Sequence, residues 1–316
     1  MALPTNTQTS YDSVGNREDL INKIYMVEQT MTPFTGKIAK VTATATKHEW
    51  QTDDLASAVD TNAVLEGDDA TTDAAIATTR LHNYTQISDK VARVTGTQES
   101  VDHAGRSSEM AYKRAKKMTE LKRDIEKSAL ANKAAAVGSN SVARVSAGIE
   151  SWITNDSFGA TGASPTGDGT DTRTDGTQRA FTETMLKTVL AASADAGANP
   201  NLVLVGSFNK QAMSAFTGNN ITRNVDSAKG ELQTSIDIYV SDFGRLEIVF
   251  SPQSRSRSAL VLDTDLWAMA TLPGRAFMSK PLAKTGDSER NQVLTEWTLE
   301  ARNEAGSGIV ADLTTA

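Results

Sequence analysis

The chain of 316 residues contains no cysteine, only three histidines and an aromatic share of 5%. The absence of cysteine excludes a disulfide scaffold, a thiolate zinc or iron–sulfur site and a cysteine nucleophile. The sequence has no run of 18 apolar residues, and its N-terminus lacks both the basic start and the apolar stretch of a secretory signal. We therefore expect a soluble, thiol-free protein made in a cytoplasm, with no membrane partner.

Basic residues are too few for a general nucleic-acid binder, because 32 Lys and Arg compare with 39 Asp and Glu, a net charge of −7. The length exceeds that of one typical domain and predicts two domains, or one domain with large excursions. Apolar residues make up 39% of the chain, and many of them are alanine. The low share of bulky apolar side chains indicates extended parts that are buried elsewhere than in this chain's own core.

One segment, residues 48–79, has no Lys or Arg at all and a local charge of −8. Its acidic residues are Glu49, Asp53, Asp54, Asp60, Glu66, Asp68, Asp69 and Asp73. Residues 47–51 and 80–94 flank this acidic stretch with patterns that predict strands. Two interpretations remain open: a solvated acidic loop, which is the usual role of a charge run, or an arm that docks on a basic surface.

A basic surface follows directly in the sequence. Thr95 and Gln98 form a loose capping box, and the chain from Ser107 to Ala136 is predicted to be helical, about 45 Å long. Its apolar stripe comprises Ala111, Ala115, Met118, Leu121, Ile125 and Ala129. Between 106 and 133 the net charge is +5, and the basic residues are Arg106, Lys113, Arg114, Lys116, Lys117, Lys122, Arg123, Lys127 and Lys133. Such a length is typical of a structural strut.

The remainder of the chain mixes both kinds of secondary structure. Residues 138–180 are rich in Gly, Ser, Thr and Asp and predict a loop or insertion with no core of its own. A helix is predicted over 182–194 and another from Ser207. The predicted strands are 201–206, 236–240, 246–250, 260–262 and 293–299, the last half-buried with Glu296 and Glu300 on its polar face. Helices and strands do not alternate regularly, which predicts an α+β fold.

Catalytic patterns are weak. Ser207 and Lys210, with Lys284-Thr285-Gly286, imitate two elements of serine penicillin-recognising enzymes, but the third has Ser241-Asp242-Phe243 where Ser-Asp-Asn is needed. His48, His82 and His103 stand in no metal-ligand pattern, and no phosphate-binding loop occurs. We expect no catalytic residue, metal, cofactor or small-molecule substrate; a serine hydrolase using Ser207 and Lys210 is the enzymatic alternative.

Several motifs, in their order and spacing, resemble the major head proteins of tailed bacteriophages with the Hong Kong 97-type capsid fold. The resemblance runs from Thr32 to Ile309. It is carried by Thr32-Pro33-Phe34, Glu49-Trp50-Gln51-Thr52-Asp53, Tyr84-Thr85-Gln86-Ile87, Ala104-Gly105-Arg106, Glu120-Leu121-Lys122-Arg123-Asp124-Ile125-Glu126, Leu204-Val205-Gly206-Ser207, Tyr239-Val240-Ser241-Asp242-Phe243-Gly244, Ala283-Lys284-Thr285-Gly286-Asp287 and Glu296-Trp297-Thr298-Leu299-Glu300.

This resemblance implies an anatomy: an N-terminal arm (1–47), an extended loop (48–90), a peripheral domain with a spine helix (91–140), an axial domain (141–264) and C-terminal strands returning to the peripheral domain (265–316). It implies a structural protein that forms pentamers and hexamers in the icosahedral head around the phage genome, assembled in the host bacterial cytoplasm. Expected partners are further copies of the chain, a separate scaffolding protein, a portal and double-stranded DNA. A nanocompartment shell of the same fold is the main alternative, and a tail or decoration protein is another.

The two charged segments then become candidate inter-subunit contacts, the loop of one subunit lying on the spine helix of the next. The candidates on the loop are Glu49, Trp50, Asp53, Asp54, Asp60, Glu66, Asp68, Asp69 and Asp73. Those on the helix are Arg106, Lys113, Arg114, Lys116, Lys117 and Arg123. The alternative is that the basic helix faces packaged DNA while the acidic loop faces solvent.

Overall fold

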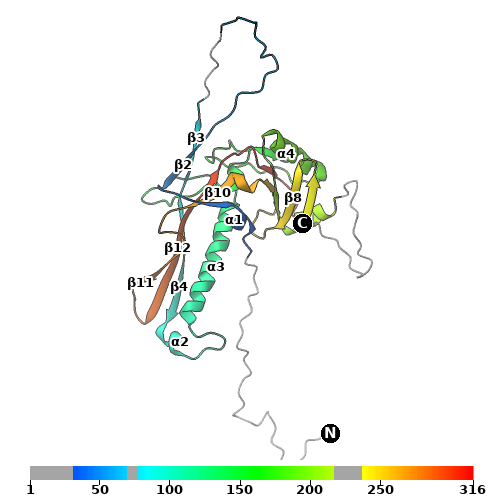
Figure 1. The fold of residues 1–316 in the computed structure, drawn as a ribbon. Coiled ribbons are helices and arrows are strands. Elements are labelled where there is room, and N and C mark those ends of the chain that lie inside the picture. The colour runs from blue at the N-terminus through cyan, green and yellow to red at the C-terminus, as the bar shows by residue number, and fades with distance from the viewer. Residues whose placement is uncertain (1–30, 70–76, 217–236, 316) are drawn as a thin grey trace, which may run out of the picture.

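The computed structural model describes residues 31–69, 77–216 and 237–315. The first 30 residues of the predicted arm, together with Asp73 and Ile236, lie outside the described residues. Figure 1 shows two sheets side by side, a long helix along one of them and a loop that leaves the body at the top.

A five-stranded sheet joins the start, the middle and the end of the described chain. Its order is β1-β10-β12-β11, and β4 pairs with the other edge of β12. The strands are β1 (Ala39–Thr42), β4 (Gln86–Thr95), β10 (Trp267–Thr271), β11 (Met278–Leu282) and β12 (Ser288–Ala301). Only the β1–β10 pair in this sheet is parallel. β12 is its axis, because it pairs with β10 and β11 along one edge and with β4 along the other.

A six-stranded sheet has the order β5-β13-β9-β6-β8-β7. Its strands are β5 (Asn155–Ser157), β6 (Leu202–Val205), β7 (Ile238–Ser241), β8 (Gly244–Phe250), β9 (Ala259–Leu262) and β13 (Gly308–Val310). Residues 265–316 thus contribute strands to both sheets, and the five domain boundaries given above stay a prediction. The two remaining strands, β2 (Lys47–Thr52) and β3 (Thr79–Tyr84), form an antiparallel ladder below the extended loop.

The helices cover the sheets. The spine helix α3 (Glu109–Ala129) lies against β4 and β12, and α4 (Glu183–Asp195) lies against β5 and β13. The shorter helices are α1 (Pro33–Lys37), α2 (Gly96–Ser100), α5 (Ser207–Ser214) and the 3-10 turns η1 (Ile149–Ser151) and η2 (Thr264–Leu266). Thr95 accepts a hydrogen bond from the Gln98 N–H at the start of α2, as the capping pattern predicts.

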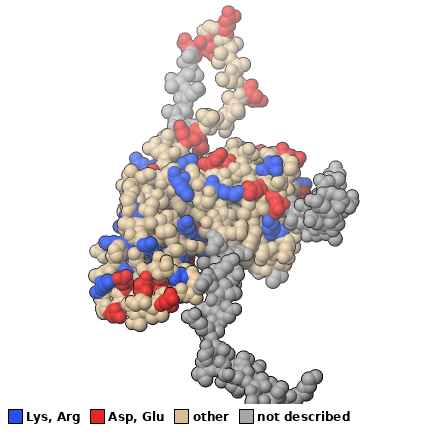
Figure 2. All heavy atoms as spheres, turned by 60° about the horizontal axis from the view of Figure 1, so that its bottom comes forward, with Lys and Arg blue, Asp and Glu red and all other residues tan. Residues whose placement is uncertain are grey.

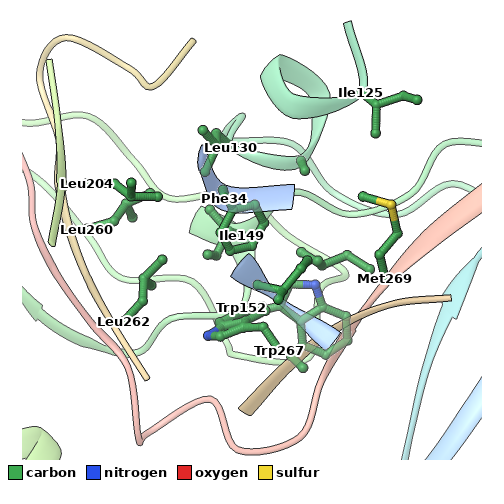
Figure 3. Close-up of a cluster of buried hydrophobic side chains, with 14 of the residues drawn as sticks. Phe34, Ile125, Leu130, Ile149, Trp152, Leu204, Leu260, Leu262, Trp267 and Met269 are labelled. Carbon is green, nitrogen blue, oxygen red and sulfur yellow. The ribbon is translucent and has the colours of Figure 1, made fainter. Parts of the chain in front are cut away.

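One hydrophobic cluster joins the two sheets (Figure 3). Leu204 and Leu260 of the six-stranded sheet belong to the same cluster as Trp267 and Met269 of the five-stranded sheet. Phe34 of α1 is fully buried there, its ring 6.4 Å from that of Trp267 in an edge-on arrangement. Because the sheets share this core, they form one body.

A buried carboxylate of the spine helix fixes α1. The Glu126 side chain accepts hydrogen bonds from the Phe34 and Thr35 N–H groups, each at 2.8 Å. These donors are unpaired within a helix, since the first N–H groups of a helix have no partner in it. Burial raises the pKa of Glu126, and the two backbone donors oppose that shift.

The fold class and most expected elements are confirmed. The predicted strands at 47–51, 201–206, 246–250 and 260–262 and the helix over 182–194 agree with the structure within two residues at each end.

The predicted end of the spine helix is wrong. The helix stops at Ala129 rather than Ala136, although the intervening sequence is rich in alanine. The backbone of this stretch pairs elsewhere, because Ala136 and Val145 exchange N–H···O bonds and the Lys133 carbonyl accepts from Gly148. Tertiary pairing therefore overrides helix propensity.

The expectation for residues 138–180 is also wrong in one respect, since part of this segment lies in the main core. Ile149, Trp152 and Ile153 are fully buried there. Gly148 allows the close approach to the end of α3, because a Cβ at this position would lie 2.0 Å from the Ala131 carbonyl oxygen. The composition of the segment did not predict this contribution to the core, because its few apolar residues stand among many polar ones.

Candidate inter-subunit surfaces

The outer part of the extended loop joins β2 to β3, and its described residues, 53–69 and 77–78, project from the body (Figure 1). Every residue from 53 to 69 is exposed, including aliphatic ones: Leu55 is 98% exposed, and Val59, Val64 and Leu65 are also in solvent. Single exposed aliphatic residues are common, but a group of them on a segment that no described residue covers is typical of an interaction surface.

The predicted acidic residues of this loop lie in solvent. They are Asp53, Asp54, Asp60, Glu66, Asp68 and Asp69, while Asp73 lies outside the described residues. Figure 2 shows acidic side chains at the far end of the loop. Among described residues, the structure pairs none of these six carboxylates with a cation, so no described side chain compensates their charge.

Two of the predicted contact residues are instead engaged at the base of the loop. Glu49 pairs with Lys47 at 2.6 Å and Arg80 at 3.8 Å, and the hydrogen bond from Lys47 lowers the pKa of Glu49. Trp50 is half-buried, and its ring lies 5.5 Å from that of Trp152. Their contact with a neighbouring subunit stays a prediction.

The basic residues of the spine region divide into paired and unpaired groups. Arg106 and Lys113 both pair with Glu109, and Lys117 pairs with Glu120 at 2.7 Å. Arg123 is half-buried and has an interaction partner. Arg114 and Lys116 are exposed, and the structure gives neither an ion pair to a described residue. These two side chains, with the exposed Lys122 and Lys127, carry the positive charge of the helix that no described carboxylate pairs with.

The loop and the start of the spine helix lie at opposite ends of the molecule (Figure 1). α2 and the first turn of α3 are at the bottom of that view, whereas the extended loop is at the top. The 26 residues between β2 and β3 can reach outward by at most about 45 Å. The described part of this segment points away from the start of the helix (Figure 1). A contact between these charged surfaces therefore requires a second copy of the chain.

The hydrolase pattern does not assemble into a site. Lys210 Nζ donates to Asp237 Oδ1 at 3.0 Å and to the Ile248 carbonyl at 3.3 Å, and no bond joins it to the exposed Ser207. Lys284 lies in the β11–β12 connection, where it pairs with Glu289 at 2.6 Å. The first motif thus lies in α5, which follows a strand of the six-stranded sheet, and the second lies in a connection of the five-stranded sheet.

Within the described ranges, no three or more Asp, Glu or His side chains are grouped as a metal ion would need. In those same ranges no helix is both long and apolar enough to cross a membrane.

Sequence reasoning missed the burial of two carboxylates on β12. Glu296 and Glu300 alternate with apolar residues, a pattern that predicts solvent exposure, yet Glu296 is only 3% exposed and Glu300 is half-buried. Three of their four partners come from other segments: Glu296 pairs with Arg144 and Arg275, and Glu300 pairs with His48 and also with Arg302, two residues further along the chain. No local sequence signal marks such pairs.

Comparison with solved structures identifies the fold. The chain is similar to a structure from Mycobacterium phage Ogopogo, with a TM-score of 0.61 and 10% identity, covering 97% of this chain and 100% of that one. A structure from Gordonia phage Cozz matches with a TM-score of 0.61 and 9% identity, over 99% of this chain and 98% of that one. The shared fold is the Hong Kong 97-type fold of phage capsid proteins.

Sequence comparison then gives the family. The model of the SU10 major capsid protein family matches residues 3–314, so the chain belongs to this family and is a structural major capsid protein of a phage. A relative, the major capsid protein of Escherichia phage Phieco32, is 38% identical over 134 residues. That alignment covers 42% of this chain and 38% of the relative, so the chain spans well under half of the relative's length.

Proposed function

We propose that this chain assembles with copies of itself, as pentamers and hexamers, into the icosahedral head that encloses the phage genome. The observation that carries the proposal is the extended loop, whose exposed acidic and aliphatic side chains have no partner among the described residues. A projecting loop of this composition is unfavourable in an isolated subunit and useful in a shell. Membership of a major capsid family supports the same role.

We further propose that the acidic loop of one subunit contacts the basic spine helix of the next. Exposed ion pairs contribute only about 0–1 kcal/mol each, so a single contact is weak and reversible. Repetition around a closed ring multiplies such contacts and allows misplaced subunits to dissociate before the shell closes. Assembly should then weaken at high salt, because the Debye length falls from about 10 Å at 0.1 M to about 3 Å at 1 M.

A charge-swap experiment tests this contact. Reversing Asp53, Asp54, Asp68 and Asp69 to Lys should sharply reduce the yield of shells seen by negative-stain microscopy while the subunit stays folded. Adding Arg114→Glu and Lys116→Glu to the same chain should recover part of that yield, because opposite charges would face each other again. Reversal of the exposed Asp195 and Asp242 is the matched control and should leave assembly intact. Unchanged yield in the loop variant would overturn the proposal.

The competing role for the spine helix is contact with packaged double-stranded DNA. In that case the Arg114→Glu and Lys116→Glu variant alone would form normal shells but package less DNA. Under the subunit-contact proposal the same variant loses shells first. Counting full, empty and absent particles by microscopy separates the two roles.

The remaining partners and the setting are also proposals. We propose a separate scaffolding protein, a portal and assembly in the host bacterial cytoplasm, and no enzymatic activity. Electron microscopy of particles from infected cells would distinguish a DNA-filled phage head from a nanocompartment shell of the same fold. A fluorescent penicillin that labelled Ser207 would contradict the non-enzymatic role.

A further inference from the structure

A single residue connects the loop-bearing ladder to the main sheet. β3 ends at Tyr84 and β4 begins at Gln86, so Thr85 is the junction between them. Thr85 is fully buried and uses all its polar groups: its hydroxyl donates to Glu296 Oε1 at 2.8 Å, its N–H donates to the Thr46 carbonyl at 2.8 Å, and its own carbonyl accepts from Arg144 Nε at 3.1 Å. The chain therefore has little freedom to bend at this point.

Glu296 extends this junction into a network. Its Oε1 also accepts from Arg144 Nη2 at 2.7 Å, and its Oε2 pairs with Arg275 Nε at 2.6 Å. One buried carboxylate thus holds the junction, the segment that carries Arg144 and the segment after β10 in one arrangement. A buried ion pair of this kind often stabilises no better than apolar packing would, but it specifies one geometry.

A second set of hydrogen bonds fixes the end of β3, next to the junction. Asn83 is fully buried; its amide donates to the Leu299 carbonyl at 2.7 Å and to Ser146 Oγ at 3.2 Å, while its oxygen accepts from the Ala147 N–H at 3.0 Å. These bonds tie β3 to β12. On the other strand of the ladder, His48 Nε2 lies 2.9 Å from Glu300 Oε2.

We propose that Asn83, Thr85, Arg144, Arg275 and Glu296, together called the loop clamp, act as positioning residues for assembly. The clamp makes the β2–β3 ladder a rigid extension of the five-stranded sheet and sets the direction in which the extended loop leaves the subunit. Movement of the loop during assembly is then confined to the residues between Thr52 and Thr79. The role of the loop's direction in assembly rests on the proposed contact with a neighbouring subunit, whereas the rigidity of the β2–β3 ladder does not.

The absence of cysteine allows a direct test by spin labels. Gln51→Cys on the exposed side of β2 and Ala192→Cys on the exposed side of α4 give a distance between the ladder and the body. Labelled chain is diluted with unlabelled chain, so that only distances within one subunit are measured. Thr85→Val and Glu296→Gln perturb the clamp. Thr295→Val is the matched control, because its buried hydroxyl on the same strand has no hydrogen-bond partner in the part of the chain that the structure describes.

The clamp predicts one narrow distance distribution in the parent chain and in Thr295→Val. In Thr85→Val and Glu296→Gln the distribution should broaden or shift while circular dichroism stays native. A narrow, unshifted distribution in both folded clamp variants would overturn the inference, as would a broad one in the parent chain. If Glu296→Gln does not fold, Thr85→Val decides. If the loop variant assembles normally in the charge-swap experiment but the clamp variants broaden or shift the distance distribution, the loop clamp is supported and only the contact with the neighbour is refuted.

Discussion

The base and the outer part of the extended loop differ in how many of their side chains are buried or paired within the subunit. At the base, Asn83, Thr85 and Glu296 are buried, with hydrogen bonds or ion pairs to distant segments. Beyond Thr52, six carboxylates and several aliphatic side chains lie in solvent with no ion pair or packing partner among the described residues. The base is therefore held by contacts within the subunit, whereas the outer loop is the surface that we propose contacts a neighbour.

The largest expected effect on stability comes from breaking the core that supports the base. Trp152→Ala should lower the free energy of unfolding by about 3–5 kcal/mol, because it empties a large buried site and removes the ring beside Trp50. Chemical denaturation measures the change. A loss below about 1 kcal/mol would show that the base does not depend on this ring.

A pH-dependent effect of on the order of 1–2 kcal/mol is expected at Lys133, which donates to Gln86 at the start of β4. Burial lowers the pKa of Lys133 from 10.5 to about 8. Between these values the unfolded chain binds the proton and the folded chain does not, so stability should rise with pH across this window. Lys133→Met should flatten this part of the curve. Denaturation at several pH values between 7.5 and 11 checks it, and equal slopes would contradict it.

Thr85→Val should cost about 1 kcal/mol, because it removes a buried hydrogen bond to Glu296. Thr295→Val should be neutral or slightly stabilising, since it removes a buried hydroxyl that bonds to no described residue. Thermal and chemical unfolding of the two variants side by side provides the measurement. Equal losses of unfolding free energy in the two variants would show that the hydrogen bond from Thr85 to Glu296 does not contribute to stability.

The smallest effect on stability, and a large one on assembly, is expected in the outer loop. Leu55→Ser, Val64→Ser and Leu65→Ser together should change the free energy of unfolding by less than about 0.5 kcal/mol, because these side chains are already in solvent. Shell yield should nevertheless fall, since the loop loses apolar surface that a neighbour would bury. A variant that unfolds more easily would place these residues in the subunit's own core.

The sequence predicted the features that depend on local pattern. The spine helix, the capping pattern at Thr95 and the strands around the acidic segment follow from periodicity and residue type over a few positions. The exposure of the acidic loop also followed, because a run of one charge sign cannot be buried without partners. Family motifs supplied the fold, which local patterns alone left at the level of α+β.

Features that depend on distant partners could not be predicted. Glu296 resembles a surface residue in its strand, and only Arg144 and Arg275 make its burial possible. The spine helix ends early because Ala136 pairs with Val145, a contact that alanine propensity does not reveal. Trp152 reaches the main core from a segment whose composition predicts a loop. In each case contacts with distant residues select one conformation among several that have similar energies when only neighbouring residues are considered.

Intermolecular cross-linking tests the central claim most directly, since each variant carries its only thiol at a chosen place. Chains with Asp68→Cys are mixed with chains carrying Lys116→Cys, allowed to assemble and treated with a short bis-maleimide. The account predicts covalent heterodimers in assembled shells and far fewer when Ala192→Cys replaces Lys116→Cys as an exposed control. Shells that form normally but give no more heterodimer with Lys116→Cys than with Ala192→Cys would contradict a loop that docks on its neighbour's spine helix.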